Sequence, residues 1–472
     1  MADINKRESK CNTRSSFWEK KWSNRKIIKD IMDGVDNLKE KGYLIQSSGE
    51  SRAKYEKRLE QALLNPILEN QIKAFVEKAF KQGVTLESDN EFIKSLEKDF
   101  DGYDRTLTEF AKDLFLGAET YSEGYVFIDM PAKKVDELGN IIVIGNERPT
   151  CEIINLDSIL HTRDNGHECN YLRFKEYKTV EDCWDDKSVE IVKEIYKKDN
   201  KVYFNIYEIH DGQEFLQNEK DTLLIDLDYI PIVPLYPAGN KKLFEVDLLW
   251  KNMARLQIGH FNAYSHYLNL SKANSTPILF GKKIGKDGDK IVMGAGVILA
   301  SDEEAAALSY VEPSGNSLSG SLTTVQKIEN DMDSYGLNVN IGQNSGGTTA
   351  TQSAIDYATI NSILSSHVIA LKQSIEKIIL VQCEWMGISN PEFTVNIPTD
   401  FNIKGDQLML QAINDAHDRR VISDKVYAER LKELGYLSDS YDREKDLDEM
   451  QLQSPNAIRP ITEVDLLEED SI

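Results

Sequence analysis

The sequence lacks any apolar run near the roughly 20 residues that are needed to cross a bilayer. Met1 to Trp22 is polar and has no apolar core of the kind found in secretory signals. Cysteine is scarce: there are five, an odd number, and no CxxC pair occurs. These absences predict a cytoplasmic protein with free thiols instead of disulfides. The cysteines are Cys11, Cys151, Cys169, Cys183 and Cys383.

Basic residues are also in deficit, because 56 Lys and Arg face 79 Asp and Glu and give a formal charge of −23. A surface that grips duplex DNA needs Lys and Arg to displace phosphate counterions, so this balance excludes ordinary nucleic-acid binding. The contents of 40% hydrophobic and 29% charged residues are typical of a folded soluble protein. The 472 residues exceed what one core usually supports, which predicts more than one domain.

Nucleotide-binding and hydrolase motifs are missing. The string nearest to a P-loop, Gly281 to Asp287, has the wrong glycine spacing and ends in Asp. No GxSxG elbow is present, so a serine nucleophile would lack its turn. We therefore expect neither an ATP site nor a catalytic serine.

Metal ligands are present only in unconvincing patterns. One set lies in strand-like sequence with spacings that fit no zinc site: His161, His167, Cys169 and Cys183. A second set could hold Mg²⁺, although a solvated turn is the simpler interpretation: Asp182, Asp185 and Asp186. The Asp287-Gly288-Asp289 turn lacks the other EF-hand ligands. We expect no catalytic residues, no metal and no cofactor.

The periodicity of the sequence predicts a helix-rich α+β fold. Apolar residues at helical spacing fill much of 52–130, and β-branched and aromatic segments separated by turns fill 141–236. Further along, we expect a helix over 245–272, a short β unit from 278 to 300, and a second helix within 316–335, mainly from 321. The last segments are a Gly-rich stretch at 336–351, a long helix from 352 to about 387, a strand at 393–397 and short helices within 405–438.

The two ends of the sequence differ in charge. The first thirty residues are locally basic, whereas the stretch from Tyr441 onward is acidic and contains Pro455 and Pro460. This composition predicts an extended acidic tail.

Several strings follow one another in a characteristic order. They are the strand Ile232–Tyr236 (IVPLY), the helix start Asp247–Leu256 (DLLWKNMARL), the loop Gly346–Thr351 (GGTTAT), the helix start Gln352-Ser353-Ala354 and the late helical string Asp415–Ser423 (DAHDRRVIS). With the β unit between two helices, this order resembles the tailed-bacteriophage portal proteins, which form the ring through which DNA enters the head. The resemblance spans roughly residues 40 to 440.

The resemblance implies an elongated subunit with a wing, a two-helix stem, a small β clip, a tunnel loop beside a long wing helix, and a helical crown. Carried over by position, its parts are an N-terminal arm and α/β wing at 1–244, stem helices at 245–272 and 316–335, a clip at 273–315, a tunnel loop at 336–351, a long wing helix and strand at 352–404, a crown at 405–440 and an acidic C-terminal tail at 441–472.

The same map assigns candidate site residues. The DNA-facing tunnel loop would present neutral side chains that touch phosphates without holding them: Asn338, Asn340, Gln343, Asn344, Ser345 and Thr348. The clip would present a docking surface: Lys282, Lys283, Lys286, Asp287, Asp289 and Lys290. Large stem residues would contact neighbouring subunits: Trp250, Met253, Phe261, Tyr264 and Tyr267.

The resemblance implies a mechanical function without enzyme activity. A ring of twelve copies would sit at one capsid vertex of the virion after assembly in the host cytoplasm. It would bind the terminase large subunit, a head-completion or tail adaptor, and the major capsid and scaffold proteins. Double-stranded DNA would slide through it without sequence specificity during packaging, retention and ejection, because an acidic wall repels phosphate at short range. No membrane partner is expected.

Three other interpretations remain open on sequence alone. The chain could be another connector or collar ring of a virion, a metal-dependent nuclease that uses the acids at Asp182–Asp186, or a bacterial scaffold protein of no viral origin.

Overall fold

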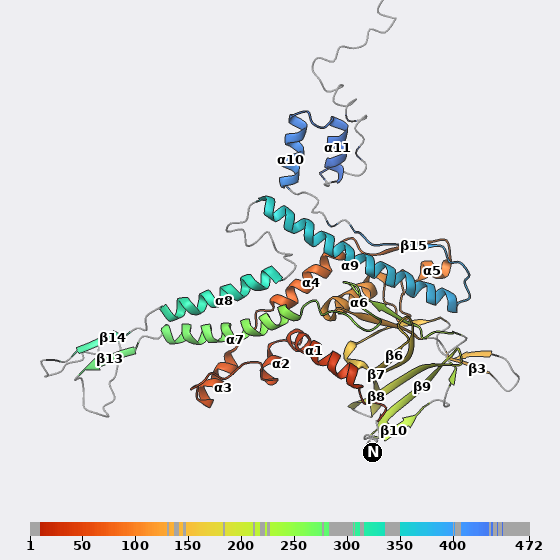
Figure 1. Ribbon diagram of the computed structural model, residues 1–472, viewed down its shortest axis with the longest axis horizontal. Helices are drawn as coiled ribbons and strands as arrows, with labels where there is room; N and C mark the ends of the chain where they lie inside the picture. The colour runs from red at the N-terminus through yellow and green to blue at the C-terminus, as the bar shows by residue number, and fades with distance from the viewer. Residues whose placement is uncertain are drawn as a thin grey trace, which may run out of the picture. The chain divides into compact units, whose positions relative to one another are not determined.

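The computed structural model forms two compact units, which are described separately (Figure 1). Unit 1 comprises Met1–Ser345 and Thr359–Asp400, and unit 2 comprises Gly346–Ala358 and Phe401–Ile472. The described residues are 10–129, 132–135, 141–144, 148–182, 185–210, 213–217, 222–223, 227–275, 278–282, 305, 307–311, 316–335, 350–399, 401, 407–433, 436–437, 441 and 446.

Unit 1 begins with helices. The sequence predicted only a basic arm before residue 30, whereas the structure has a packed helix there, α1. Ser15 caps it by accepting a hydrogen bond from the backbone N–H of Trp18. Trp18, Ile28 and Ile31 bury its apolar face. The helices are α1 (Ser16–Met32), α2 (Val35–Glu40), α3 (Arg52–Gln61), α4 (Ile67–Ala79), α5 (Glu91–Ser95) and α6 (Leu107–Tyr121).

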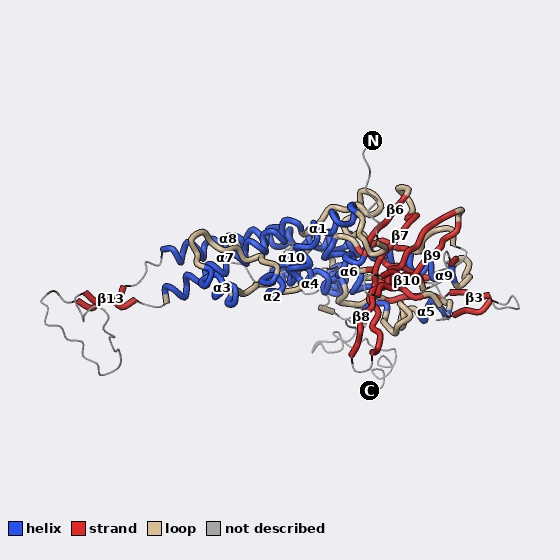
Figure 2. Tube along the Cα trace, turned by 90° about the horizontal axis from the view of Figure 1, so that it is seen from below, coloured by secondary structure: helices blue, strands red, loops and turns tan. Residues whose placement is uncertain are grey.

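Two antiparallel sheets follow, in the part of the chain where β-branched and aromatic residues predicted strands. One has the strand order β12-β2-β5, and the other has the order β10-β9-β8-β7-β6 with β11 paired to β9. Figure 2 shows the strands β6 to β10 of the second sheet grouped together in red. The strands of both sheets are β2 (Gly124–Asp129), β5 (Thr150–Ile154), β6 (Ile159–Asp164), β7 (Cys169–Asp182), β8 (Asp185–Lys198), β9 (Lys201–His210), β10 (Gln213–Leu216), β11 (Thr222–Leu223) and β12 (Ile232–Leu235). The 3-10 turn η1 (Leu156–Ser158) joins β5 to β6.

Trp18 of α1 packs into the core beneath these sheets with Tyr125, Phe127 and Phe174. Two small two-stranded sheets complete this region of unit 1: β1 (Thr85–Ser88) with β15 (Phe393–Asn396), and β3 (Ala132–Val135) with β4 (Ile141–Ile144). The β1–β15 pairing joins residues about 300 positions apart in the sequence, and periodicity alone could not predict it.

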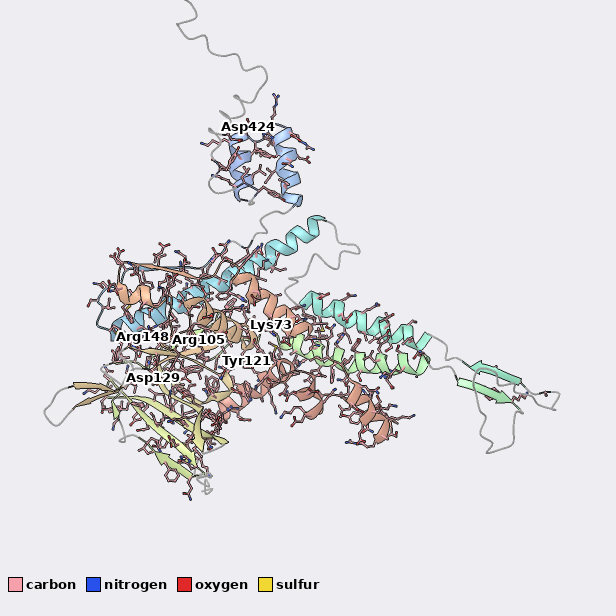
Figure 3. The ribbon with its side chains drawn as sticks, turned by 180° about the vertical axis from the view of Figure 1, so that it is seen from behind. Lys73, Arg105, Tyr121, Asp129, Arg148 and Asp424 are labelled. Carbon is pink, nitrogen blue, oxygen red and sulfur yellow. The ribbon has the colours of Figure 1, made fainter. Side chains whose placement is uncertain are left out.

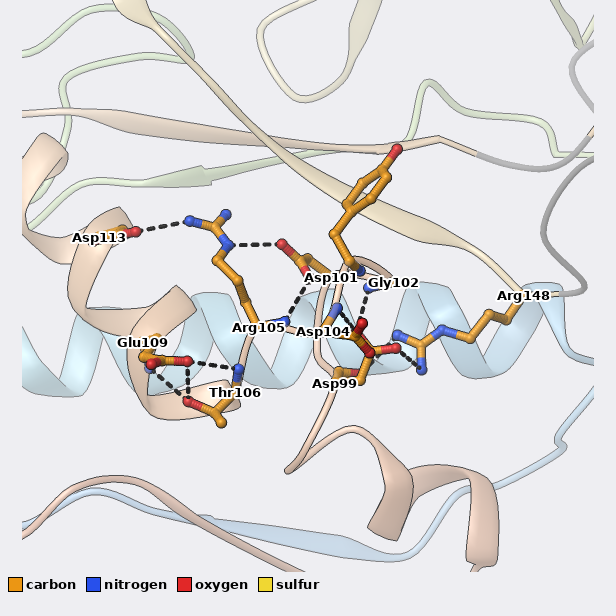
Figure 4. A network of polar contacts seen from close by, with 10 residues as sticks. Asp99, Asp101, Gly102, Asp104, Arg105, Thr106, Glu109, Asp113 and Arg148 are labelled. Carbon is orange, nitrogen blue, oxygen red and sulfur yellow. Dashed lines mark hydrogen bonds and ion pairs between the residues drawn. The ribbon is translucent and has the colours of Figure 1, made fainter.

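A polar network fixes the loop between α5 and α6 (Figure 4). Asp101 accepts from Arg105 Nε at 2.7 Å, and Arg105 also reaches Asp113 at 2.7 Å. Asp99 pairs with Arg148 just before β5, at 3.4 Å. Gly102 has φ +86°, and a Cβ there would lie 2.8 Å from Thr150. Ion pairs therefore hold this loop in place, and its backbone conformation at position 102 requires glycine.

The remaining long helices are α7 (Lys251–Asn274), α8 (Asn316–Tyr335) and α9 (Ala350–Trp385). The hairpin β13 (Ile278–Lys282) and β14 (Ala307–Val311) lies between α7 and α8 in the chain. The predicted strands near 291–300 lie outside the described residues. In unit 2, α10 (Gln407–Asp418) packs against α11 (Asp424–Glu433), where His417 stacks on Tyr427 at 4.1 Å.

The α+β prediction is confirmed, and the helix boundaries need one correction. The predicted first stem helix began at 245, but α7 begins at Lys251. Phe244 adopts a positive φ of 64°, and the Leu249 N–H donates to Ser122 Oγ at 2.8 Å. These contacts hold residues 244–249 in a non-helical turn, although their apolar spacing continues that of the helix.

Candidate functional site: a helix pair with an inserted hairpin

α7 is anchored in unit 1 by its buried face. Trp250, at its N-cap, donates from Nε1 to the carbonyl of Glu119 on α6 at 2.9 Å. Gln257 is fully buried, yet both ends of its amide have partners: it accepts from Leu68 N at 3.0 Å and donates to the Asn65 carbonyl at 2.7 Å. Because both bonds reach the start of α4, they fix the rotation of α7 against the helices of unit 1.

α8 lies antiparallel beside α7, and the two views agree on this arrangement (Figures 1 and 2). His260 on α7 is fully buried, and its Nε2 is 3.0 Å from Glu329 Oε1 on α8. Its ring stacks on Tyr264 with 5.6 Å between centroids, and Tyr264 stacks on Tyr267 at 6.3 Å. The His260–Glu329 contact fixes the position of α8 along the axis of α7, which is called its height below.

A second link joins α3 to α7. Arg58 pairs with Glu50 at 2.8 Å and donates to Ser265 on α7 at 3.4 Å. The hydrogen bonds from Arg58 lower the pKa of Glu50 to about 2, so this carboxylate stays ionised over the working pH range. The link holds the middle of α7 against α3.

The stem residues predicted as subunit contacts divide into two groups. Trp250, Met253 and Phe261 are at most 4% exposed and belong to one core cluster with residues of α1, α4 and α8. They pack within this chain, and their assignment as subunit contacts stays a prediction. Tyr264 and Tyr267 are half-buried, which leaves part of each ring open to a neighbour.

Little of the other two predicted surfaces is described. Lys282, at the end of β13, is exposed and lies opposite Ala307 in the hairpin register. The other clip candidates lie outside the described residues: Lys283, Lys286, Asp287, Asp289 and Lys290. The same holds for every tunnel-loop candidate: Asn338, Asn340, Gln343, Asn344, Ser345 and Thr348. The acidic tail from 441 is described only at 441 and 446.

One member of the first metal set, Cys183, lies outside the described residues. The register pairs Asp182 with Asp185 across the end of the β7–β8 hairpin, and Asp186 is exposed. Within the described ranges, no three His, Cys, Asp or Glu side chains come together as a metal site. Over those ranges, no helix combines the length and the apolar character that membrane crossing requires.

Sequence reasoning missed one charged cluster. Lys193 on β8 lies within 3.3 Å of three carboxylates, from Asp129, Glu152 and Glu176 (Asp129 is labelled in Figure 3). The three acids come from β2, β5 and β7. No linear pattern predicts this cluster, because only strand pairing brings the residues together. It joins the two sheets.

Burial raises the pKa of Glu152 to about 7, with neighbouring Glu176 adding to the effect and Lys193 opposing it. The folded chain therefore binds more protons than the unfolded chain between about pH 4.5 and 7, and its stability falls as pH rises through this window. Glu152→Gln should raise the melting temperature at pH 8, and the gain should shrink towards pH 5. Glu168→Gln, a half-exposed partner of Lys197, is the control and should show no such pH dependence. An equal rise in melting temperature at pH 5 and at pH 8 would contradict the raised pKa of Glu152.

Part of the chain matches a known family of domains. The model of a family described as a domain of unknown function (DUF4055) matches residues 250–386, from the start of α7 to just beyond α9. No curated protein matches the sequence. The solved structures that are similar to this chain include two particle necks. The neck of a native GTA particle computed with C12 symmetry has TM-score 0.39 and 11% identity, over 78% of this chain and 89% of that one. The neck of an empty GTA particle computed with C6 symmetry has TM-score 0.38 and 11% identity, over 79% and 90%. Likeness at this level carries no argument about function.

Proposed function

We propose that this chain is a subunit of a virion connector ring, and that the ring is a portal. The observation that carries the proposal is the order of elements: antiparallel helices α7 and α8 joined through the β13–β14 hairpin, then the 36-residue α9, then the α10–α11 pair. This is the stem, clip, wing-helix and crown order that the sequence resemblance implies.

The proposed role is mechanical. The ring would form the channel for DNA packaging, retention and ejection. The clip would bind the terminase large subunit and later a head-completion or tail adaptor, and the outer parts would meet capsid and scaffold proteins. A chain with a charge of −23 suits a channel that must let DNA slide, because a basic wall would hold the phosphates. Hydrolysis of ATP would belong to the terminase.

Another connector or collar ring is the second candidate. Both candidates predict a ring, and they differ in the step at which the protein acts. A portal is needed to package DNA, whereas a collar protein joins a head that is already filled.

Electron microscopy of the purified full-length protein tests the proposal. We expect rings with an axial hole, and we expect phage particles that lack the protein to contain no DNA. A monomer at all concentrations would overturn both candidates. Filled heads without tails would favour the collar ring over the portal.

A further inference from the structure

Charge is unevenly distributed along this acidic chain. Residues 248–286 contain no Asp or Glu, although Asp and Glu number 79 in the whole sequence. α7 lies inside this run and carries three basic residues, Lys251, Arg255 and Lys272. α8 has the opposite balance, with Glu329, Asp331 and Asp333 against Lys327. Two neighbouring helices of one chain thus have opposite net charge.

The basic groups at the start of α7 form no ion pair with the described residues of their own chain. Lys251 and Arg255 are exposed, and within the described part of the chain neither forms an ion pair. The His260–Glu329 contact places Arg255 near the height of Asp333, because the helices are antiparallel and each rises 1.5 Å per residue. Helical spacing directs Arg255 away from α8, so α8 of its own chain does not neutralise it.

The exposed side of α7 also has a surface suited to another helix. Leu256, Ala263 and Tyr267 are half-buried and follow one stripe at helical spacing, with exposed Gly259 between them. Leu256 also packs against the core of its own chain, so the stripe borders the covered side of α7. Glycine inside a helix costs about 1 kcal/mol relative to alanine. A Cβ at Gly259 would meet no atom within 4 Å, so packing inside the described part of the chain does not require glycine here. A close approach by a helix from another molecule would explain it.

We propose that this stripe of α7, with Arg255 at its edge, binds α8 of a second copy of the chain, with Arg255 near Asp331 and Asp333 of that copy. The inference rests on the proposed ring. In a ring, one face of each subunit contacts a different face of the next subunit. If the helix pair runs along the ring axis, the rotation that relates neighbours brings residues of equal height together. Opposite charges on α7 and α8 suit such a contact. They also reduce the repulsion between copies that each carry −23.

The first test is steric. Gly259→Leu adds volume on an open surface of α7 and should leave the circular dichroism spectrum and melting temperature of the monomer unchanged or raised. We expect it to raise the concentration for half-assembly, measured by mass photometry, at least ~10-fold. Gly259→Ala should have a smaller effect in the same direction. Gly117→Ala is the matched control, because it changes another helical glycine whose Cβ would also meet nothing within 4 Å.

The second test reverses charge. Arg255→Glu should weaken assembly, and so should Asp331→Lys combined with Asp333→Lys. The three changes together in one chain should restore much of the assembly, because opposite charges then face each other again. A subunit contact that does not use these residues would give no restoration and would overturn the proposal.

The alternative is that basic α7 contacts DNA. Fluorescence anisotropy with a short duplex distinguishes the two: if Arg255→Glu abolishes duplex binding and leaves assembly intact, the proposed contact is wrong. Rings that form equally well with Gly259→Leu would reject this docking surface while the proposed function stands. A wild-type chain that never forms rings would reject the proposed function itself.

Discussion

Glu123→Gln is expected to lower the free energy of unfolding by about 3–5 kcal/mol, the cost typical of breaking a buried ion pair. Glu123 is 1% exposed and lies between Lys21 and Arg25 of α1, at 2.6 and 2.8 Å. It also accepts from the Tyr125 hydroxyl at 2.5 Å. The substitution leaves two cations inside the protein with no carboxylate beside them.

The size of this defect should depend on pH. Burial lowers the pKa of Lys21 to about 8, even with Glu123 favouring the charged amine. Without Glu123 that pKa falls further, so the folded variant loses the proton at lower pH than the unfolded chain does. The stability of the variant then begins to rise at a lower pH than the stability of the wild type does. The difference in stability between the two proteins should therefore narrow between pH 7 and pH 9.

Urea denaturation followed by tryptophan fluorescence measures the deficit at both pH values. Glu19→Gln is the control, because Glu19 is a 66% exposed partner of Arg14 and should change stability by less than about 1 kcal/mol. If Glu123→Gln unfolds the chain at pH 7, recovery of structure at pH 9 still tests the idea. A loss below 1 kcal/mol would show that Lys21 and Arg25 reach water when Glu123 is removed.

The same cluster shows why the sequence predicted only part of the fold. Strands such as β7 and β9 were predicted because β-branched and aromatic residues recur along them between turn signals. α1 was missed because its helical face includes Lys21 and Arg25, which bring charge to positions that a pattern search expects to be apolar. Their burial depends on Glu123, about 100 residues away, and no local pattern contains that partner.

The site was predictable to a similar degree. Helices α7, α8 and α9 were predicted within a few residues, because their apolar periodicity is long and no proline interrupts it. The sequence did not predict which face of each helix packs inside the chain and which stays open. Phe261 and Tyr267 are both large aromatic residues on α7, but α1, α4 and α8 cover the first and leave the second partly open. That difference arises from tertiary packing.

Phe261→Ala and Tyr267→Ala should therefore have different consequences. Phe261 is fully buried, and its truncation leaves a cavity that should cost about 3–5 kcal/mol in the unfolding of the monomer. Tyr267 keeps part of its ring exposed and stacks on Tyr264 at the end of the row of three rings that begins at His260. Its truncation should therefore cost the monomer about 1 kcal/mol or less. The larger effect of Tyr267→Ala should be on ring assembly.

Denaturation at a protein concentration too low for assembly measures the stability of the monomer. Mass photometry at a higher concentration measures ring assembly. A Phe261→Ala chain that keeps its stability but forms no rings would support the assignment of Phe261 as a subunit contact. The opposite result, unstable monomers whose remaining folded fraction still assembles, would place Phe261 in the core of the subunit. Tyr267 would then mark the boundary on α7 where the core of one chain ends and the surface available to the next begins.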